Sequence, residues 1–187
     1  GRNLTDSLLR YYVDGKLSEE KIKKMMHGYL ANYSFADWNI GRVIDALGDS
    51  KYAENTIVVF CSDNGFHMGE KLRMGKATLW EPSAYVPLMI KVPGEKGYSS
   101  KATASLIDVY PTLIDYCKLI APPQKLDGHS MVPLFQDRKQ KWEWPSFMGY
   151  NDQGYASIRD EQFRFIQYPD GSQELYYMEK DPEEIIN

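Results

Sequence analysis

The chain contains the stretch TIVVFCSDNG at residues 56–65, and this stretch decides the expected fold. Residues 56–61 form a continuous apolar, largely β-branched run, which is typical of a strand covered on both faces, as in a parallel sheet. Polar residues and a glycine follow at once at 62–65, where a strand commonly ends in a turn. Residues 56–61 are therefore predicted to be a buried strand with a functional loop at its carboxyl end.

The segments around this strand alternate between helix and strand patterns. Apolar side chains recur every three or four positions over residues 18–47, which predicts one or two long helices with a buried stripe, starting near Ser18 and ending at Gly48. Residues 86–92 read as a second covered strand, and residues 106–119 as another helix. This order predicts an α/β layered fold, in which ligands bind at the carboxyl ends of strands.

The pattern changes after residue 120. A proline-rich connector begins at 121–123, and a Pro-Asp-Gly turn signal stands at 169–171. Short alternating runs occupy residues 147–150, 156–158, 163–166 and 174–177. They predict an antiparallel meander. We therefore expect residues 1–120 to belong to the α/β domain and residues 121–187 to form a linker and a small antiparallel β subdomain.

Composition excludes several classes of partner. Asp and Glu outnumber Lys and Arg by 26 to 22, for a net charge of −4, so nucleic acid is not expected as the main partner. No run approaches the roughly 18 apolar residues of a membrane span, so no membrane partner is expected either. The two cysteines, Cys61 and Cys117, read as small buried apolar residues rather than a disulfide framework.

Four side chains in and after the 62–65 loop carry candidate chemistry. Asp63 and Asn64 offer adjacent hard oxygen donors suited to Ca²⁺ or Mg²⁺, although Asp, Asn and Gly are also ordinary strand-end residues. Lys76 is a candidate for anion binding or for protonating a leaving oxygen, against the simple alternative of a surface lysine. His67 is a candidate general acid, ligand or structural polar residue.

The order of motifs along the chain resembles that of type I sulfatases of the alkaline phosphatase superfamily. The motifs are SDNG at 62–65, HMGEK at 67–71, Lys76, LWE at 79–81 and VPL at 86–88, with further similar segments at 34–37, 40–47, 106–112, 126–130, 132–134, 157–159, 174–176 and 181–182. The resemblance covers roughly residues 20–187 and is greatest for the bacterial, iduronate-sulfatase-like branch. It implies the carboxyl-side part of the sulfatase fold.

The resemblance also implies roles for individual residues. Asp63 and Asn64 match the family's second pair of metal ligands, although many relatives have His in place of Asn64. Lys76 matches the lysine that contacts the sulfate and helps to stabilise the leaving oxygen, which makes it both catalytic and substrate-binding. His67 lies close enough in sequence to be given the same two roles, but it does not match the family's main catalytic histidine.

The family's nucleophile is a formylglycine made from Cys or Ser in a C/S-x-P/A-x-R sequence, and no Cys or Ser of this chain lies in such a sequence. We therefore expect the formylglycine in a missing amino-terminal part of the same protein, and this chain alone to be inactive. The resemblance implies hydrolysis of sulfate esters on a sugar or other small alcohol, in a periplasmic, secreted or lysosomal setting. The alternatives are a phosphodiesterase or phosphonate monoester hydrolase of the same superfamily, and a noncatalytic lobe.

Overall fold

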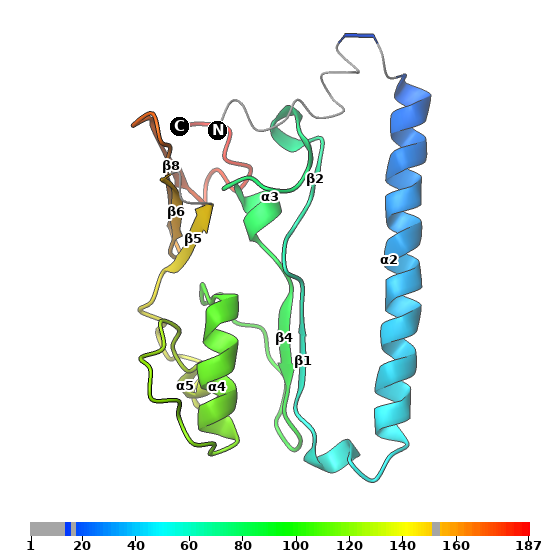
Figure 1. Ribbon diagram of the computed structural model, residues 1–187, viewed down its shortest axis with the longest axis vertical. Helices are drawn as coiled ribbons and strands as arrows, with labels where there is room; N and C mark the ends of the chain where they lie inside the picture. The colour runs from blue at the N-terminus through cyan, green and yellow to red at the C-terminus, as the bar shows by residue number, and fades with distance from the viewer. Residues whose placement is uncertain (1–13, 16–17, 151–153) are drawn as a thin grey trace. The chain divides into compact units, whose positions relative to one another are not determined.

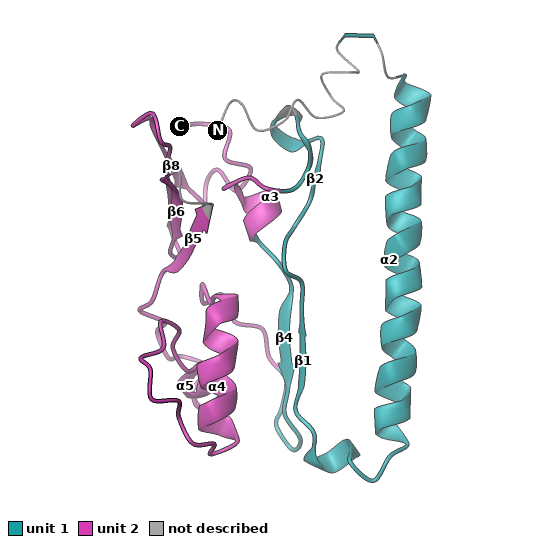
Figure 2. Ribbon diagram, in the orientation of Figure 1, with its two compact units in different colours: residues 1–76, 85–97 teal, residues 77–84, 98–187 magenta. Residues whose placement is uncertain are grey.

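The computed structural model describes residues 14–15, 18–150 and 154–187, and Figure 1 shows the course of the chain. The chain divides into two compact units, which Figure 2 distinguishes by colour. The first comprises residues 1–76 and 85–97, and the second residues 77–84 and 98–187. The predicted division into residues 1–120 and 121–187 stays a prediction.

The first unit begins with the long helix α2 (Glu19–Gly48), which confirms the helix predicted over 18–47. The Ser18 hydroxyl accepts a hydrogen bond from the Lys21 amide at 3.3 Å, and so caps one of the free N–H groups of the first turn. Acidic residues in that turn complement the helix dipole. The helix ends where Asp49 follows Gly48, as the sequence predicts.

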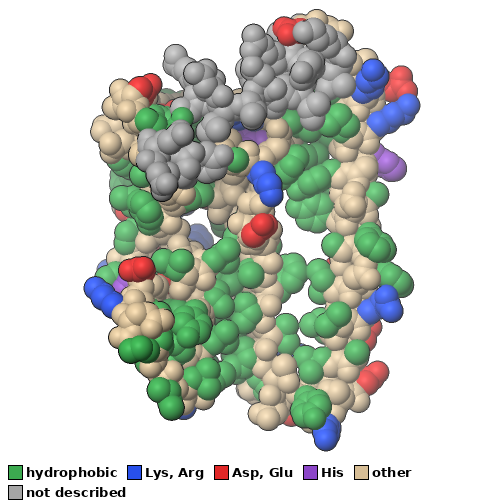
Figure 3. All heavy atoms as spheres, viewed as in Figure 1, with side chains coloured by type: hydrophobic (Ala, Val, Ile, Leu, Met, Phe, Trp, Pro, Cys, Tyr) green, Lys and Arg blue, Asp and Glu red, His purple; other side chains and the backbone are tan. Residues whose placement is uncertain are grey.

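The predicted burial of the apolar stripe on α2 is wrong for this chain. No described residue of the helix is buried, and the stripe residues Tyr33 and Ile40 are 60% and 38% exposed. Figure 3 shows hydrophobic side chains at the surface along α2. The periodicity is real, but no strand or helix among the described residues packs closely along the helix, so its apolar side chains stay in contact with solvent.

The two predicted strands form a pair, β1 (Val58–Cys61) and β4 (Leu88–Lys91). They run antiparallel, with Val59 opposite Ile90, so the expected parallel arrangement is wrong for this pair. An apolar run determines how deeply a strand is buried, but it does not determine the direction of its neighbour. The strand is also only partly covered, because its first three residues are half-buried and Cys61 is exposed.

A small hairpin follows β1 in the sequence. It consists of β2 (His67–Met68), the short 3-10 turn η2 (Glu70–Leu72) and β3 (Met74–Gly75). A second 3-10 turn, η1 (Ala53–Asn55), connects α2 to β1. The hairpin was not predicted, because each of its strands has only two residues and neither shows a periodic pattern.

The second unit contains the predicted helix 106–119 as two pieces, the 3-10 turn η3 (Leu106–Asp108) and α4 (Val109–Tyr116). Ser105 and Asp108 form a reciprocal capping box at its start. Two shorter helices, α3 (Glu81–Ala84) and α5 (Val132–Gln136), complete the helical part. Cys117 caps the end of α4 and is exposed, as Cys61 is, so the predicted burial of both cysteines is wrong.

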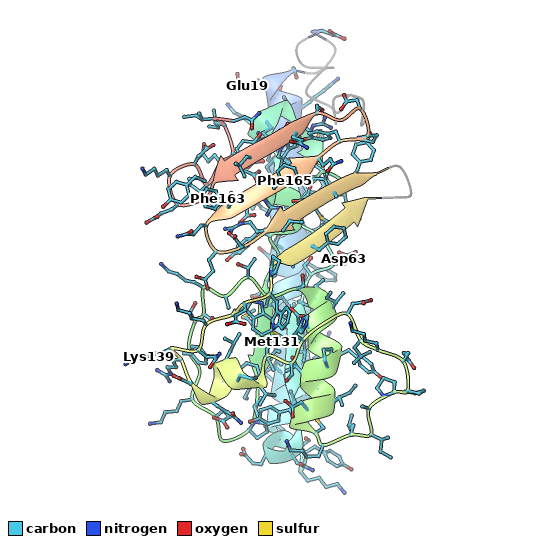
Figure 4. All side chains as sticks on the ribbon, turned by 90° about the vertical axis from the view of Figure 1, so that its left-hand side faces the viewer. Glu19, Asp63, Met131, Lys139, Phe163 and Phe165 are labelled. Atoms are coloured by element: carbon cyan, nitrogen blue, oxygen red, sulfur yellow. The ribbon has the colours of Figure 1, made fainter. Side chains whose placement is uncertain are left out.

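The predicted meander is confirmed as a four-stranded antiparallel sheet in the order β5-β6-β7-β8. Its strands are β5 (Ser146–Tyr150), β6 (Tyr155–Arg159), β7 (Phe163–Gln167) and β8 (Gln173–Tyr177). The turn at 169–171 joins the last two, and Gly171 adopts a φ of 82° there. Figure 4 shows the side chains of this sheet, with Phe163 and Phe165 of β7 labelled.

One face of the sheet packs against the segment that includes α3. The buried core consists of Leu79, Ile166, Tyr168, Tyr176 and Met178. Beside it, Trp80 Nε1 donates to Glu174 Oε2 at 2.7 Å, and the Tyr176 hydroxyl donates to the same oxygen at 2.8 Å. Residues 79–81 are therefore held by the carboxyl-terminal sheet through both apolar and polar contacts.

A buried ion network adds to this attachment. Arg164 donates from Nη1 to Leu79 O at 3.1 Å and to Ser157 Oγ at 3.0 Å, and its Nη2 contacts Glu81 Oε2. Its Nε lies 2.7 Å from Glu184 Oε1, while Glu184 Oε2 accepts from the Glu81 amide at 2.9 Å. Both Arg164 and Glu184 are buried, so their charges depend on the opposite charges within this network for compensation.

No helix in the described ranges is long and apolar enough to cross a lipid bilayer.

Candidate functional site

The loop after β1 is held by hydrogen bonds of its own residues. The Ser62 amide donates to Pro87 O at 3.3 Å, which continues the pairing of β1 with β4 past the end of the strand. The Ser62 hydroxyl donates to Asn64 O at 2.9 Å, and Asn64 Nδ2 donates to Gly65 O at 2.9 Å. Because Nδ2 donates in this way, the amide oxygen Oδ1 of Asn64 remains as an acceptor for another group.

The β2–β3 hairpin brings Lys76 to this loop. His67 pairs with Gly75 and Met68 with Met74, so Lys76 follows the last paired residue of the hairpin. Its Nζ donates to Asn64 Oδ1 at 3.0 Å. The cation and the amide that the sequence predicts to serve one site are therefore in direct contact, although twelve positions separate them in the chain.

Asp63, which is labelled in Figure 4, and Lys76 are both exposed. Their exposure leaves both charged groups open to a ligand. Asn64, which accepts from Lys76, is half-buried. The predicted metal ligands, which follow β1, and the predicted sulfate-binding lysine, which follows β3, thus lie in one unit of the chain.

His67 differs from these three residues because its side chain is fully buried, with 0% exposure. Its Nδ1 lies 3.2 Å from the carbonyl oxygen of Glu70. Burial is the largest influence on its pKa and lowers it from 6.5; positive Arg73 and Lys71 lower it further, while the contacts with Glu70 oppose the change. The imidazole is therefore neutral near pH 7.

Glu70 organises the tip of the hairpin with both its backbone and its side chain. Its carbonyl oxygen accepts from the Arg73 amide at 3.0 Å as well as from His67. Its carboxylate accepts from the Met68 amide at 2.6 Å. Glu70 therefore supports the hairpin tip rather than presenting its carboxylate to a ligand.

Sequence reasoning missed a ring contact between α2 and the loop. Tyr29 packs against Phe66 with ring centroids 4.8 Å apart, and its hydroxyl lies 3.2 Å from that of Tyr33. Burial, followed by this hydrogen bond, raises the pKa of Tyr29 to about 12. Tyr29 belongs to the apolar stripe, but the stripe alone does not indicate which residue it meets.

The donor atoms of the loop fit part of a site for a hard divalent cation. Asp63 supplies a carboxylate and Asn64 an amide oxygen, which are the atom types that Ca²⁺ and Mg²⁺ prefer. Ca²⁺ takes about six to eight oxygen ligands, so two residues provide only a share of them. Within the described part of the chain, no cluster of three or more His, Cys, Asp or Glu side chains is arranged to hold a metal.

The sequence matches two known families over most of its length. Residues 4–119 match the Sulfatase family, and residues 69–187 match the family described as N-sulphoglucosamine sulphohydrolase, C-terminal. The chain belongs to the sulfatase family. The resemblance inferred from the motifs at 62–88 is therefore confirmed at the level of the family.

Individual relatives support this assignment for the sulfatase chain. A sulfatase of Formosa agariphila is 34% identical over 188 residues, covering 100% of this chain and 37% of that protein. Among solved structures, a protein in complex with its substrate D-glucosamine-2-N,6-O-disulfate has a TM-score of 0.78 at 28% identity, covering 95% of this chain and 40% of its own. The phosphonate monoester hydrolase of Agrobacterium radiobacter has a TM-score of 0.75 at 27% identity, with 91% and 38% covered.

These structures confirm the predicted fold class, the carboxyl-side part of an alkaline-phosphatase-like sulfatase fold with a small antiparallel sheet. The sulfatase chain spans less than half the length of each of these three relatives.

Proposed function

We propose that the protein to which this chain belongs hydrolyses sulfate esters of sugars or other small alcohols. The observation that carries the proposal is the 3.0 Å contact between Lys76 Nζ and Asn64 Oδ1. It joins the lysine expected to contact the sulfate to a residue expected to hold the metal. An exposed lysine in contact with a half-buried amide oxygen, in a sulfatase-family chain, has the composition that binding of a small anion next to a cation requires.

In this proposal Lys76 contacts the sulfate group and stabilises the oxygen of the departing alcohol. Its ammonium group carries three donors and a full positive charge, so it interacts more strongly with the leaving oxygen as negative charge develops there. Lys76 is exposed, which allows an ester to reach it. The lysine therefore acts as both a substrate-binding and a catalytic residue.

Asp63 and Asn64 would hold a Ca²⁺ or Mg²⁺ ion together with ligands from elsewhere in the protein. Such an ion, when bound, neutralises charge on the nonbridging oxygens of the ester as a Lewis acid. The formylglycine nucleophile is proposed to lie in a part of the protein outside this chain. Because the nucleophile and the remaining metal ligands are both proposed to lie outside this chain, the chain alone is expected to be inactive.

His67 belongs to the same hairpin as Lys76. Contact with a substrate, which its place in the sequence suggested, requires an accessible ring, and its side chain is fully buried. Burial therefore favours a role in which His67 shapes the site.

One relative supports a substrate class. The related complex structure contains a sulfated saccharide as its substrate, and we propose the same class here. From the motif order we also propose that the protein belongs to the bacterial, iduronate-sulfatase-like branch. The remaining part of the same protein is the proposed partner of this chain, with no role for nucleic acid or membrane. A periplasmic, secreted or lysosomal location is proposed because sulfatases commonly act there.

Hydrolysis of a phosphonate monoester or phosphodiester is the second candidate. The similarity to the phosphonate monoester hydrolase favours it, because one fold can carry different reactions and the pocket then decides between them. A noncatalytic lobe is a weaker candidate, because Asp63, Asn64 and Lys76 are all present.

The test is an assay of the full-length protein with a chromogenic aryl sulfate and Ca²⁺, beside an aryl phosphonate monoester. Full-length Lys76→Ala, this chain alone and the control Lys125→Ala, which changes another exposed lysine, are assayed in parallel. The proposal is supported if the wild type and Lys125→Ala show sulfatase activity while Lys76→Ala and this chain alone do not. A preference for the phosphonate ester moves the assignment to the second candidate, and activity in this chain alone contradicts the proposed place of the nucleophile.

A further inference from the structure

The tip of the β2–β3 hairpin has a backbone that needs external support. Lys71 has a φ of 52°, in the left-handed region that residues other than glycine seldom adopt. Gly69 and Gly75 have φ values of 132° and 119°. A non-glycine residue in that region costs about 1–3 kcal/mol unless the surroundings compensate. The tip therefore keeps its conformation only while neighbouring groups hold it.

Hydrogen bonds to the Glu70 carbonyl oxygen hold the tip, and one of them comes from His67 within the same hairpin. Because a carbonyl oxygen only accepts, the 3.2 Å contact between Glu70 O and His67 Nδ1 requires the proton to be on Nδ1. The same oxygen accepts from the Arg73 amide at 3.0 Å. His67 is also opposite Gly75 in the strand pairing, so one residue is tied to both the tip and the base of the hairpin.

Lys76 depends on this arrangement because it follows Gly75 directly. A shift of the pairing by one residue would turn the side chains of β3 to the opposite face. Lys76 Nζ would then move away from Asn64 Oδ1, which it now reaches at 3.0 Å. Precise pairing between His67 and Gly75 is thus a condition for the contact on which the proposed site rests.

We infer that His67 is a positioning residue, whose Nδ1–H donates to the Glu70 carbonyl and fixes the hairpin in the register that places Lys76 beside Asn64. This inference rests on the proposed function for its effect on turnover, but its structural content stands independently. It assigns His67 no contact with the substrate and no proton transfer. That role agrees with a side chain that is 0% exposed.

Two substitutions of similar size separate positioning from acid–base chemistry. Asparagine carries an N–H donor at nearly the place of Nδ1, so His67→Asn retains the bond to Glu70 O. Glutamine carries its donor one bond further out, close to the place of Nε2, so His67→Gln loses that bond. Neither amide titrates near neutral pH. If His67 transferred protons in the reaction, both variants would therefore lose that function.

The experiment measures kcat, KM and the pH–rate profile of both variants in the full-length protein, on whichever ester the wild type hydrolyses. We expect His67→Asn to retain kcat/KM within about threefold with an unchanged pH profile. We expect His67→Gln to lose up to about a hundredfold, mainly in kcat, as misplacement of a catalytic group by about 1 Å does. Equal loss in both variants with a missing limb of the pH profile overturns the inference, and so does full activity in both.

A second readout does not depend on activity. Hydrogen–deuterium exchange of the full-length protein is followed in peptides that cover residues 66–76, with peptides from β5–β8 as the internal control for folding. Faster exchange at 66–76 in His67→Gln but not in His67→Asn supports positioning, even if neither ester is hydrolysed. Exchange that is unchanged in His67→Gln overturns the inference, whereas absence of wild-type turnover alone counts only against the proposed function.

Discussion

Lys76 donates from Nζ to Oδ1 of Asn64 at 3.0 Å, and the two residues are expected to affect metal binding in opposite ways. Asn64 supplies a ligand oxygen, so full-length Asn64→Ala should bind Ca²⁺ about tenfold more weakly or worse. Lys76 places a positive charge beside that oxygen, so Lys76→Ala should bind Ca²⁺ with equal or higher affinity. Isothermal titration calorimetry with Ca²⁺ on the metal-free full-length protein measures both.

The two variants control for each other, because Asn64 and Lys76 are in contact but the expected changes in Ca²⁺ affinity differ in sign. Weaker Ca²⁺ binding in both would mean that Lys76 supports the loop rather than repelling the ion. Unchanged binding in Asn64→Ala would remove Asn64 from the proposed ligand set.

The pKa of His67 predicts a dependence of stability on pH. Burial is the main cause that lowers this pKa below 6.5 in the folded state, so the unfolded chain binds the proton more readily. The stabilisation from the neutral ring is complete above about pH 6.5 and is lost as the pH falls below that value, by at most about 1.4 kcal/mol per pH unit. Denaturant unfolding of full-length wild type and His67→Asn at pH 7.5 and 5.5 measures this difference.

His67→Asn carries no titratable ring, so the stability of the wild type relative to this variant should decrease on acidification. A relative stability that is constant between the two pH values would show that His67 has the same pKa in the folded and unfolded states.

The buried pair Arg164–Glu184 is expected to contribute strongly to stability. Removing the guanidinium in Arg164→Met leaves the Glu184 carboxylate, which is 0% exposed, without its counter-charge. Loss of one partner of a buried pair costs about 3–5 kcal/mol. Denaturant unfolding followed by tryptophan fluorescence measures the loss, and Trp80 reports on the segment that the network holds.

Lys23→Met is the matched control, because it breaks an exposed pair. Lys23 lies 2.6 Å from Glu19 with side chains 73% and 69% exposed, and pairs of this kind contribute about 0.3–0.5 kcal/mol. If Arg164→Met costs no more than Lys23→Met, the Glu184 carboxyl must become neutral at little cost, and the network is not a major source of stability.

Sequence patterns predicted those parts of the fold that depend on neighbouring residues. The helix Glu19–Gly48 follows from its periodicity and from the capping residue Ser18, and the β5–β8 meander follows from short alternating runs and the turn at 169–171. The antiparallel pairing of β1 with β4 did not follow, because an apolar run carries no information on the direction of its partner. Exposure of the α2 stripe did not follow either, since periodicity specifies a face but not what covers it.

The candidate site shows the same division. The loop at 62–65 and Lys76 were predicted from the order of motifs, but their contact depends on the two-residue strands of a hairpin with no periodic signal. The burial of His67 and its bond to Glu70 also depend on that hairpin. Arg164 contacts both Glu81 and Glu184. Arg164 and Glu81 are more than 80 residues apart in the sequence, and no local pattern specifies such a pairing.

Gly128 provides a last prediction, because a side chain there would meet backbone. A Cβ at this position would clash with the Ile107 carbonyl group and come within 3.0 Å of the Asp108 amide nitrogen. The close approach allows the His129 amide to donate to Asp108 Oδ1 at 2.8 Å, which ties the loop to the start of the helix. Gly128→Ala should therefore cost about 1–3 kcal/mol, as forced overpacking does.

Gly97→Ala is the comparison for Gly128→Ala. No atom lies within 4 Å of a Cβ at Gly97, and its φ is not in the left-handed region, so the change should stay within about 0.5 kcal/mol. Denaturant unfolding of the two full-length variants measures the difference. Equal stability of both would mean that the loop at Gly128 moves away from Ile107 at little cost, and that the bond from His129 to Asp108 does not depend on close backbone contact.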